Sequence, residues 1–429
     1  MRLPGRLSAA IAVLADIEAR KRPAAEALKD WGLANRFAGS GDRAAIGNLV
    51  YDALRRRASL AHTIGSEAPR ALVLAVAVRE WGEDVAALNA AFAEDRFAPE
   101  PITAEEAGLL AAPDPLAGAP DHVRADVPEW TAASLAQALG PDWVAEGAAM
   151  TGRPPLDLRV NRLKSDRDRV MKALKRFDPE PTAIAPLGVR FPAGGRDSRT
   201  PNVQADEGYL KGWFEVQDQG SQIVSLLAGA RPGEQVLDLC AGAGGKTLAM
   251  AATMDNKGQI FAYDSERPRL APIYDRLKRN GVRNAQVRAP DPGALDDLAG
   301  RLDRVVVDAP CTGTGTWRRR PDAKWKLTAE QLAARVAEQR AILERAAGFL
   351  KPGGELVYIT CSILREENDG QVEAFLQAHP DLGVLPPAEV WSKAFPTVPL
   401  PARSSALGVT LTPRTTDTDG FFLSVLRKR

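Results

Sequence analysis

The sequence contains only three cysteines, Cys240, Cys311 and Cys361, among its 429 residues. They are too few and too scattered for a disulfide framework or a four-ligand zinc site, so we expect no metal. The sequence also lacks any apolar run near the roughly 20 residues that a membrane-spanning helix needs. Asp16 and Glu18 interrupt the apolar part of its first residues, which is typical of an ordinary helix and not of a secretory signal. We therefore expect a cytoplasmic monomer with no membrane partner.

A strong net charge is also missing, because 56 Lys and Arg balance 55 Asp and Glu to a formal net charge of +1. No global field therefore indicates a nucleic-acid partner. The charges are unevenly distributed: residues 152–176 contain nine Lys or Arg against three Asp, and residues 79–126 contain eleven acids against three Arg. A polyanion would have to bind a local basic patch, and a solvated charged surface is the alternative interpretation of each cluster.

The length and the patterning predict three parts. Residues 1–128 begin with helical apolar spacing, as in Ile46, Leu49 and Val50, which predicts a small helical bundle. They end in a segment rich in Pro, Ala and acids, residues 98–128, which predicts a linker with little structure. Residues 129–216 combine two short helices, an alternating strand at 156–163 and a basic helix, which predicts a small α+β module.

Residues 217–429 alternate strand, loop and helix. This alternation predicts a parallel, doubly wound, Rossmann-like sheet, so the fold class is α/β with a helical part and an α+β part before it. The strands are expected at Val236–Leu239, Gln259–Tyr263, Ala285–Arg288, Arg304–Val307, Glu355–Ile359 and Phe421–Leu426.

A glycine-rich loop, "VLDLCAGAGGKTLAM", follows the first of these strands. Its end resembles that of a phosphate-binding P-loop, but G-x-x-x-x-G-K-[ST] requires glycine at position 240 and the chain has Cys240. The other ligand that uses such a turn is a nucleoside-bearing cofactor on a Rossmann-like sheet, where an acid after the next strand accepts the ribose hydroxyls. Asp264 lies at that place, so the loop and the acid together predict a cofactor site.

Two cysteines follow later strands: Cys311 in "DAPCTGTG" after the fourth, and Cys361 in "YITCSILREEN" after the fifth. Both should lie at the carboxyl edge of the sheet, where ligands bind in open α/β folds. A thiolate is a strong nucleophile once its pKa is lowered, so either cysteine could attack a substrate. Cys240 is expected to be a small buried hydrophobe.

Several motifs resemble, in order and spacing, those of the RsmB/NOP-type RNA cytosine-5 methyltransferases: "LDLCAGAGGKT", "AYDSERPRL", "DAPCTGTG" with "RRRPDAKW", and "YITCSILREEN". The resemblance runs from about Gly152 to the C-terminus and includes "LRVNRLK", "VQDQGSQ" and "DTDGFF". The stretch "SGDRAAIGNLVYDALRR" is similar to the NusB-like helical domain of the bacterial ribosomal members. The sequence departs from the family at Ala243, where Pro is usual, and at Pro290, where Gly precedes the Asp.

The resemblance implies transfer of a methyl group from S-adenosyl-L-methionine to carbon 5 of a cytosine in structured RNA. Carbon 5 is a poor nucleophile until a thiolate adds to carbon 6, which is covalent catalysis. By resemblance Cys361 is the attacking thiolate, Cys311 assists breakdown of the adduct, and Asp308 hydrogen-bonds the cytosine edge. The Pro-Cys attack of DNA cytosine-5 enzymes would nominate Cys311 instead, and the residues alone leave that choice open.

The resemblance also implies binding residues. Asp264 would bind the ribose and Asp291 the adenine, and Lys246 would pair with a neighbouring acid or touch the substrate. The cofactor set comprises Cys240, Ala241, Gly242, Ala243, Gly244, Gly245, Lys246, Asp264, Arg269, Asp291 and Asp308. The expected RNA-binding set comprises Arg159, Asn161, Lys164, Arg318, Arg319, Arg320 and Lys324, with Trp317 and Trp325 available to stack on splayed bases.

Three alternatives to a 16S ribosomal RNA methyltransferase are weighed. A transfer-RNA cytosine methyltransferase of the same family shares the catalytic loops, so only the helical part favours ribosomal RNA. A non-catalytic ribosome-assembly factor would keep the fold but need not retain both cysteines and Asp308. A P-loop NTPase is disfavoured by Cys240.

Overall fold

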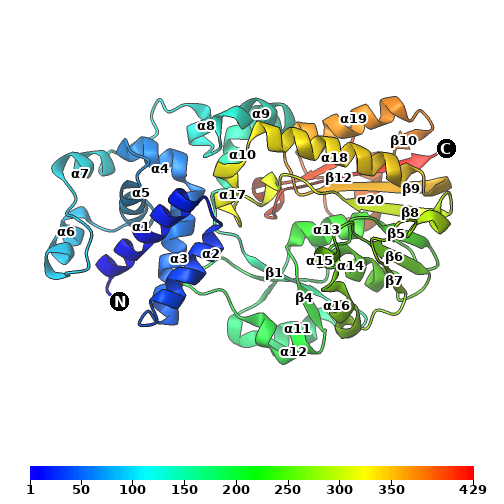
Figure 1. The fold of residues 1–429 in the computed structure, drawn as a ribbon, viewed down its shortest axis with the longest axis horizontal. Helices are drawn as coiled ribbons and strands as arrows, with labels where there is room; N and C mark the ends of the chain where they lie inside the picture. The colour runs from blue at the N-terminus through cyan, green and yellow to red at the C-terminus, as the bar shows by residue number, and fades with distance from the viewer.

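The computed structural model describes residues 1–429, and helices fill its first quarter (Figure 1). Apolar residues three and four apart on α3, such as Ile46, Leu49 and Val50, are fully buried, as their spacing predicts. No helix of the chain combines the length and the apolar character that crossing a membrane requires. The helices of this part are α1 (Leu3–Arg20), α2 (Ala24–Ala34), α3 (Ser40–Arg55), α4 (Arg57–Ile64), α5 (Pro69–Ala75), α6 (Val85–Glu94), α7 (Ala104–Leu110) and α8 (Asp121–Arg124).

The prediction that residues 98–128 form a linker with little structure is wrong. Thr103 caps α7 by accepting the Glu106 amide, and the Glu106 side chain in turn accepts the Thr103 amide. Ile102 and Leu110 are buried in the core of the N-terminal helices, and Val127 is buried farther along. A few isolated apolar residues therefore anchor this acidic segment. The prediction was wrong because it rested on the average composition of the segment, in which these residues are too few to stand out.

A four-stranded antiparallel sheet follows two helices in the next part of the chain. Its order is β2-β3-β1-β4, and one face packs on α11 through buried residues such as Leu158, Val170 and Phe214. This arrangement agrees with the predicted α+β pattern. The elements are α9 (Ala132–Leu139), α10 (Trp143–Ala149), β1 (Leu156–Val160), α11 (Arg167–Ala173), β2 (Glu180–Pro181), β3 (Gly188–Phe191), α12 (Glu207–Leu210) and β4 (Phe214–Val216).

The last half of the chain builds an eight-stranded sheet of order β10-β12-β9-β8-β5-β6-β7, with β11 paired to β12. Strands β5 to β9 are parallel, as predicted, whereas β12 is antiparallel to β9. All six predicted strands are present. The strands are β5 (Gln235–Asp238), β6 (Gln259–Tyr263), β7 (Ala285–Arg288), β8 (Leu302–Asp308), β9 (Leu350–Thr360), β10 (Leu382–Val384), β11 (Val409–Leu411) and β12 (Phe421–Lys428).

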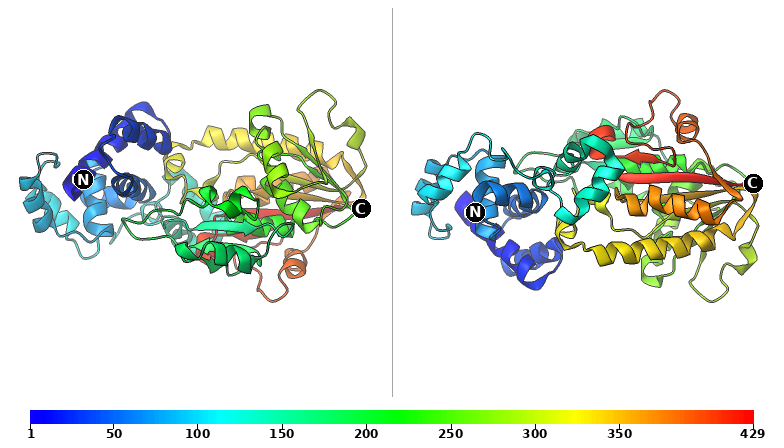
Figure 2. Two further views of the ribbon diagram at one scale, coloured as in Figure 1. Left: turned by 90° about the horizontal axis from the view of Figure 1, so that it is seen from below. Right: turned by 90° about the horizontal axis from the view of Figure 1, so that it is seen from above.

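Helices cover both faces of this sheet (Figures 1 and 2). Alternate residues of one strand reach opposite cores: Val306 packs with α13, α14 and α20, whereas Val305 and Val307 pack with α18 and α19. The helices are α13 (Gln219–Leu227), α14 (Gly245–Thr253), α15 (Arg267–Leu270), α16 (Ile273–Asn280), α17 (Pro321–Lys326), α18 (Ala329–Ala347), α19 (Asp369–Ala378), α20 (Pro387–Ala394) and α21 (Pro413–Thr416).

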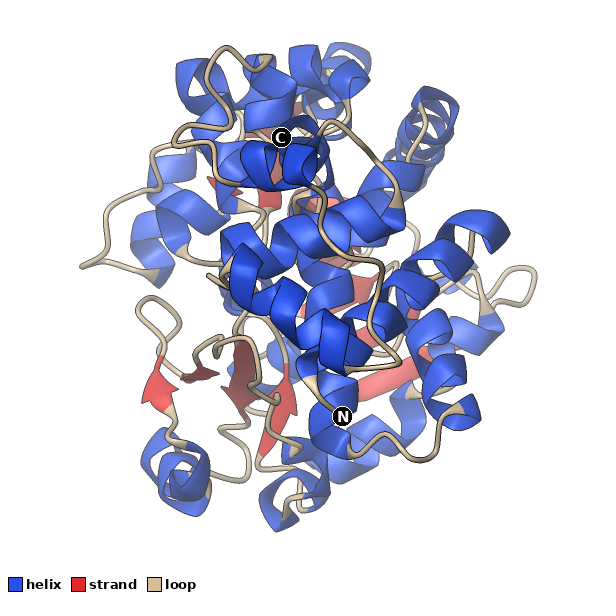
Figure 3. Cartoon of the chain, turned by 90° about the vertical axis from the view of Figure 1, so that its left-hand side faces the viewer, coloured by secondary structure: helices blue, strands red, loops and turns tan.

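The chain order places a switch point between neighbouring strands β5 and β8. The chain runs outward from β5 to β6 and β7, then returns to β8 and continues on the other side to β9. Loops at the carboxyl ends of β5 and β8 therefore diverge, which is where open α/β sheets bind ligands. Viewed from the side of the N-terminal helices, those helices lie in front of the large sheet (Figure 3).

Candidate active site

The glycine-rich loop joins β5 to α14 and turns through two left-handed residues. Gly242 has φ +49° and Gly244 has φ +83°. A Cβ on Gly244 would lie 2.5 Å from Ile273 Cγ1, so this position has no room for a side chain. A Cβ on Gly242 would meet nothing closer than 3.8 Å, which leaves the loop backbone bare on that side. Such a bare backbone is what close approach by a nucleoside cofactor needs.

Asp264 follows β6 and holds this loop. One of its carboxylate oxygens accepts the Gly242 amide at 2.9 Å, and the other accepts the Glu266 amide at 3.0 Å. The predicted ribose acid therefore lies directly beside the loop, with lone pairs left to accept hydroxyls. Arg269 lies near it, with Nη2 3.9 Å from Asp264 Oδ2. Asp291, in the loop after β7, is exposed and pairs with Arg267.

Asp238, at the end of β5, belongs to this site and is absent from the predicted set. Its side chain is fully buried, and Thr247 Oγ1 donates to Oδ2 at 2.6 Å. Its Oδ1 is buried without any hydrogen-bond partner, so a buried acceptor is left for a donor. Burial raises the pKa of Asp238 to about 7. The signal in the sequence was a lone acid inside the apolar stretch "VLDL".

The fit of S-adenosyl-L-methionine to these residues rests on complementary chemistry. The bare glycine loop suits the nucleoside, Asp264 suits the ribose hydroxyls, and the unpartnered Asp238 oxygen suits a cationic amine. Cys240, also in the loop, packs against the core between the sheet and α18, and burial raises the pKa of its thiol. This agrees with the prediction that Cys240 is a small hydrophobe and not a nucleophile.

The loops after β8 and β9 bring Cys311 and Cys361 together. Their Sγ atoms are 3.3 Å apart, although 50 residues separate them. The hydrogen bond to Cys361, followed by burial, raises the pKa of the Cys311 thiol well above its ordinary value. Cys311 is therefore held in its protonated thiol form, and either sulfur can be the donor of the hydrogen bond between them.

The two cysteine loops touch each other through backbone atoms. The Gly315 amide donates to the Cys361 carbonyl at 2.9 Å, and the Gly420 amide donates to the Gly315 carbonyl at 2.8 Å. A Cβ on Gly315 would lie 2.2 Å from the Gly420 carbonyl oxygen. Glycine is therefore required where the loop of Cys311, the loop of Cys361 and the segment before β12 meet.

Glu367 and Asn368 anchor the same loops and were missed by the sequence reasoning. Glu367 is fully buried and accepts the Thr312 amide at 2.8 Å, next to Cys311. Asn368 accepts from Thr360 Oγ1 at 2.6 Å and donates to the Ser362 carbonyl at 2.9 Å, so it grips both neighbours of Cys361. They belong to "REEN", which ends the motif around Cys361, but a charged tetrapeptide gives no sign of burial.

Asp308 ends β8 and faces Lys246 across the switch point. Lys246 Nζ donates to Asp308 Oδ2 at 2.9 Å and to Ser221 Oγ at 3.0 Å. The Asp308 side chain is about one third exposed, whereas Lys246 is buried. The lysine thus pairs with a neighbouring acid, which was one of its two expected roles.

Most of the predicted RNA-binding residues are buried, so those predictions are corrected. Arg318 and Arg319 both pair with the buried Asp419, and Lys324 Nζ is enclosed by the carbonyls of the N-terminal helices and of Asp126. An enclosed cation already holding its partners cannot also neutralise a phosphate. The buried members are Arg159, Asn161, Arg318 and Lys324; Arg319 is half-buried.

The remaining two members, Lys164 and Arg320, are exposed, but Lys164 Nζ donates to the Lys211 and Arg279 carbonyls. The two tryptophans are also misassigned. Trp317 is buried in a core with α9, and Trp325 packs against the N-terminal helices with its Nε1 donating to the Leu54 carbonyl at 2.6 Å. The Trp317 indole is therefore closed to a base, and the partly exposed Trp325 is held against the N-terminal helices.

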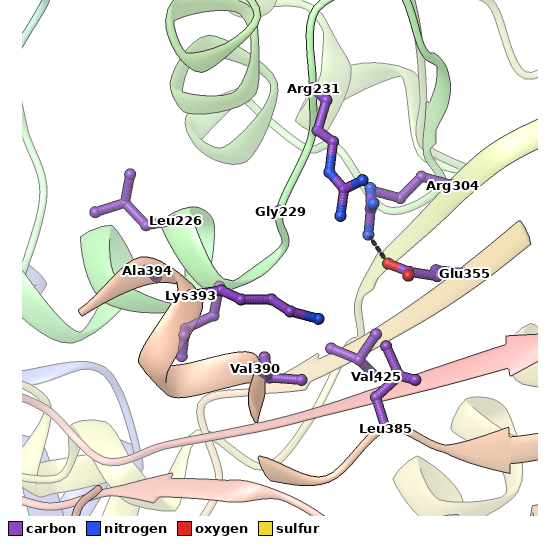
Figure 4. A pocket seen from close by; sticks show the side chains of 11 residues that line it. Leu226, Gly229, Arg231, Arg304, Glu355, Leu385, Val390, Lys393, Ala394 and Val425 are labelled. Carbon is purple, nitrogen blue, oxygen red and sulfur yellow. Dashed lines mark hydrogen bonds and ion pairs between the residues drawn. The ribbon is translucent and has the colours of Figure 1, made fainter. Parts of the chain in front are cut away.

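Two cavities bear on where a substrate could enter. A cavity of about 640 Å³ opens beside Cys311 and Thr312, and Lys21 and Pro23 of the N-terminal helices form part of its wall. A smaller cavity of about 190 Å³ is lined by Arg304 and other residues near the amino ends of β8 and β9 (Figure 4). Because the cysteines follow the carboxyl ends of these strands, the larger cavity, which Cys311 lines, is the one of the two on their side of the sheet.

Comparisons with known proteins identify the family of the chain. The family described as "16S rRNA methyltransferase RsmB/F" matches residues 225–427, and a "Methyltr_RsmF/B-like, ferredoxin-like domain" matches residues 127–194. The protein is 36% identical over 304 residues to "Ribosomal RNA small subunit methyltransferase B" of Klebsiella pneumoniae, a match covering 70% of this chain and 66% of that protein. The probable counterpart from Synechocystis is 33% identical over 305 residues, with 67% and 66% covered. The match thus spans just under two thirds of the length of these relatives.

Two solved structures are similar over long stretches. The structure titled PH0851 has a TM-score of 0.73 at 22% identity and covers 100% of both chains, which shows a shared fold. A methyltransferase homolog from Pyrococcus horikoshii has a TM-score of 0.58 at 27% identity, covering 72% of this chain and 98% of that one. The two matched regions together make up more than half of the sequence, and the chain belongs to the RsmB/F family of S-adenosyl-L-methionine-dependent methyltransferases.

Proposed function

We propose that this protein methylates carbon 5 of a cytosine in structured RNA, with 16S ribosomal RNA as the preferred target. The observation that carries the proposal is the pair of thiols 3.3 Å apart at the edge of the sheet where the cofactor loop and Asp308 also lie. The names of the curated relatives support the choice of ribosomal RNA. Such a substrate is found in the cytoplasm.

Cys361 is the attacking thiolate in this proposal. The raised pKa of Cys311 keeps that thiol protonated, which leaves Cys361 as the candidate nucleophile of the pair. The sulfur of Cys361 bonds to carbon 6 of the cytosine, and the electron pair of the 5,6 double bond becomes available at carbon 5. Asp308, held by Lys246, accepts a hydrogen bond from the amino group at the base edge beside the ring nitrogen and so orients the ring for attack.

The bound cofactor supplies an electrophilic methyl group, which carbon 5 accepts. Cys311 remains beside the adduct, because its sulfur lies 3.3 Å from that of Cys361. Cys311 can then release its proton to solvent and accept the proton that leaves carbon 5. The bond between carbon 6 and sulfur breaks, and its electron pair returns Cys361 to the thiolate. The net change is replacement of one hydrogen by one methyl group, with one proton released.

We also propose the roles of the three parts of the chain. Residues 1–128 would form a NusB-like part that recognises ribosomal RNA, residues 129–216 an RNA-binding module, and residues 217–429 the catalytic domain. Exposed cations of α11 and its flanks, including Arg169, Lys172 and Lys175, replace the buried residues as candidate phosphate contacts. Arg169 lies 4.0 Å over the Trp213 ring, a pairing that could also support a base.

A trapping experiment tests the covalent mechanism. Cys311→Ala should accumulate an RNA complex that survives denaturation, because the adduct forms but breaks down slowly. Cys361→Ala and the double variant should form no such complex, and the double variant serves as the matched control. A complex formed by Cys361→Ala alone would reverse the two roles, and no complex with any variant would contradict covalent catalysis.

A second assay tests the substrate. Methyl incorporation would be measured on bare small-subunit ribosomal RNA, on assembled small subunits and on transfer RNA. We expect labelling of ribosomal RNA, and bisulfite sequencing would then locate the 5-methylcytosine. Labelling of transfer RNA alone would overturn the preferred target.

A further inference from the structure

A continuous chain of hydrogen bonds connects the four-stranded sheet with the proposed catalytic acid. Arg159 of β1 donates Nη1 to Gln217 Oε1 at 2.5 Å, and Gln217 Nε2 donates to Ser221 Oγ at 3.0 Å. Lys246 Nζ donates to the same Ser221 oxygen at 3.0 Å and to Asp308 at 2.9 Å. Five side chains from β1, the segment before α13, α13, α14 and β8 therefore form one connected network.

The direction of each hydrogen bond in this network is fixed by chemistry. Arginine and lysine can only donate, so Gln217 must present its oxygen to Arg159 and its NH₂ group to Ser221. Both lone pairs of Ser221 Oγ are then occupied, one by Gln217 and one by Lys246. A flipped amide would place two donors against each other. Ser221 is thus locked as an acceptor for the ammonium that holds Asp308.

Burial makes this network stiff. Arg159 and Lys246 are both largely buried, and Arg159 Nη1 also donates to the Gly245 carbonyl at 3.0 Å, in the first turn of α14. Burial lowers the pKa of Arg159 only to about 10, so the guanidinium stays charged at neutral pH. Arg159 therefore anchors the end of the hydrogen-bond network that lies farthest from Asp308. A buried, fully directed network transmits a displacement at one end more faithfully than exposed side chains would.

We propose that Gln217 and Ser221 are positioning residues, which orient Lys246 and through it the carboxylate of Asp308, and so couple the four-stranded sheet to the catalytic acid. This inference rests on the proposed cytosine methylation, since Asp308 acts on the base there. Neither residue touches the reacting atoms in this scheme. A shift of β1 when RNA binds the small sheet would move Asp308 by way of Arg159, Gln217 and Ser221.

The test compares Ser221→Ala with Ser225→Ala, a matched control one turn along α13. The Ser225 hydroxyl donates only to the Ser221 carbonyl and lies outside the network. We expect Ser221→Ala to lower the single-turnover rate of methyl transfer about tenfold, because it removes one hydrogen bond to a charged group. The KM for RNA and for the cofactor should change less than twofold. Ser225→Ala should leave the rate unchanged, and Ser221→Thr, which keeps the hydroxyl, should restore most of it.

Gln217→Met supplies a second variant that loses both side-chain hydrogen bonds at similar volume. Because Gln217 and Ser221 act in series, the double variant should be no slower than the slower single variant. Equal rates for Ser221→Ala and Ser225→Ala in an enzyme that methylates RNA would overturn the positioning role and leave the proposed function intact.

A crystal structure of Ser221→Ala provides a readout that does not depend on activity. We expect Lys246 Nζ to leave its place and its 2.9 Å ion pair with Asp308 to lengthen or break. An unchanged ion pair would overturn the inference even if the protein proved inactive on RNA. A broken ion pair in the variant, combined with a wild-type enzyme that methylates no RNA, would count against the proposed function alone.

Discussion

Replacing Gly315 with alanine should push the Cys311 loop away from the segment before β12 and so disturb its hydrogen bond to the Cys361 loop. The added Cβ would lie 2.2 Å from the Gly420 carbonyl oxygen, whereas real Cβ contacts essentially never fall under 3.0 Å. The Cys311 loop and the segment before β12 must therefore part by about 0.8 Å. Both contacts of Gly315 are with backbone, so no side chain can rotate away to relieve the clash.

The expected loss of rate and of stability depends on where this displacement occurs. Overpacking of this kind costs roughly 1–3 kcal/mol, and a misplacement near 1 Å at reacting groups can cost on the order of a hundredfold in rate. The Gly315 amide holds the Cys361 carbonyl directly, so the shift is applied at the nucleophile. We expect Gly315→Ala to lower the single-turnover rate by about 30-fold or more and Tm by at least about 2 °C.

The assays are methyl transfer with the cofactor in excess and thermal unfolding by differential scanning fluorimetry. Gly108→Ala in α7 is the control, because a Cβ there meets nothing within 4 Å and should slightly stabilise the helix. A Gly315→Ala enzyme that keeps the wild-type rate within twofold would refute the argument that backbone contact sets the spacing of the cysteines.

Three further outcomes are expected. Arg304→Met should lower the unfolding free energy by about 3 kcal/mol in chemical denaturation, because it leaves Glu234 and Glu355 without their buried partner; a loss under about 1 kcal/mol would contradict this. Burial raises the pKa of Asp238 to about 7, so the folded state holds a proton that the unfolded state loses near pH 4. Stability should therefore fall between about pH 4 and pH 7, and Asp238→Asn should flatten that part of the Tm profile; an identical profile would show that Asp238 does not titrate there. Lys172→Glu should weaken RNA binding and reduce its salt dependence in filter-binding assays, and an unchanged salt slope would remove this surface from the interface.

The strands of the large sheet could be located from the sequence because each is a short apolar run between turns. Val305 to Val307 reads as such a run, and both faces of this strand are indeed buried. The residues of a strand do not determine its direction within the sheet. β12 (Phe421–Lys428) runs antiparallel to β9 because the chain enters it beside Thr360, at the end of β9. The apolar periodicity of a strand does not record from which end the chain enters it.

The candidate site was predictable to the extent that its motifs are local. Cys311 and Cys361 were expected at one edge because each follows a strand, and the structure brings their sulfurs together. The prediction of the RNA-binding residues was wrong because the sequence shows which side chains are charged but not which ion-pair or hydrogen-bond partners they have. Arg318 is neutralised by Asp419, about 100 residues later, and the ammonium of Lys324 donates its hydrogen bonds to carbonyls more than 190 residues earlier. Partners so distant in sequence are supplied by the tertiary fold alone.

The segment that continues from the Cys311 loop belongs physically to two parts of the molecule. Lys324 donates to the carbonyls of Arg55 and Asp126, Trp325 donates to that of Leu54, and Arg55 donates to the carbonyl of Arg318. Removing residues 1–128 would expose the Lys324 ammonium and the Trp325 indole to water and take away their hydrogen-bond acceptors. Both residues belong to α17, the short helix that follows the loop of Cys311. The proposed catalytic half is therefore structurally incomplete by itself, because the N-terminal part supplies Lys21 and Pro23 to the wall of the cavity beside Cys311.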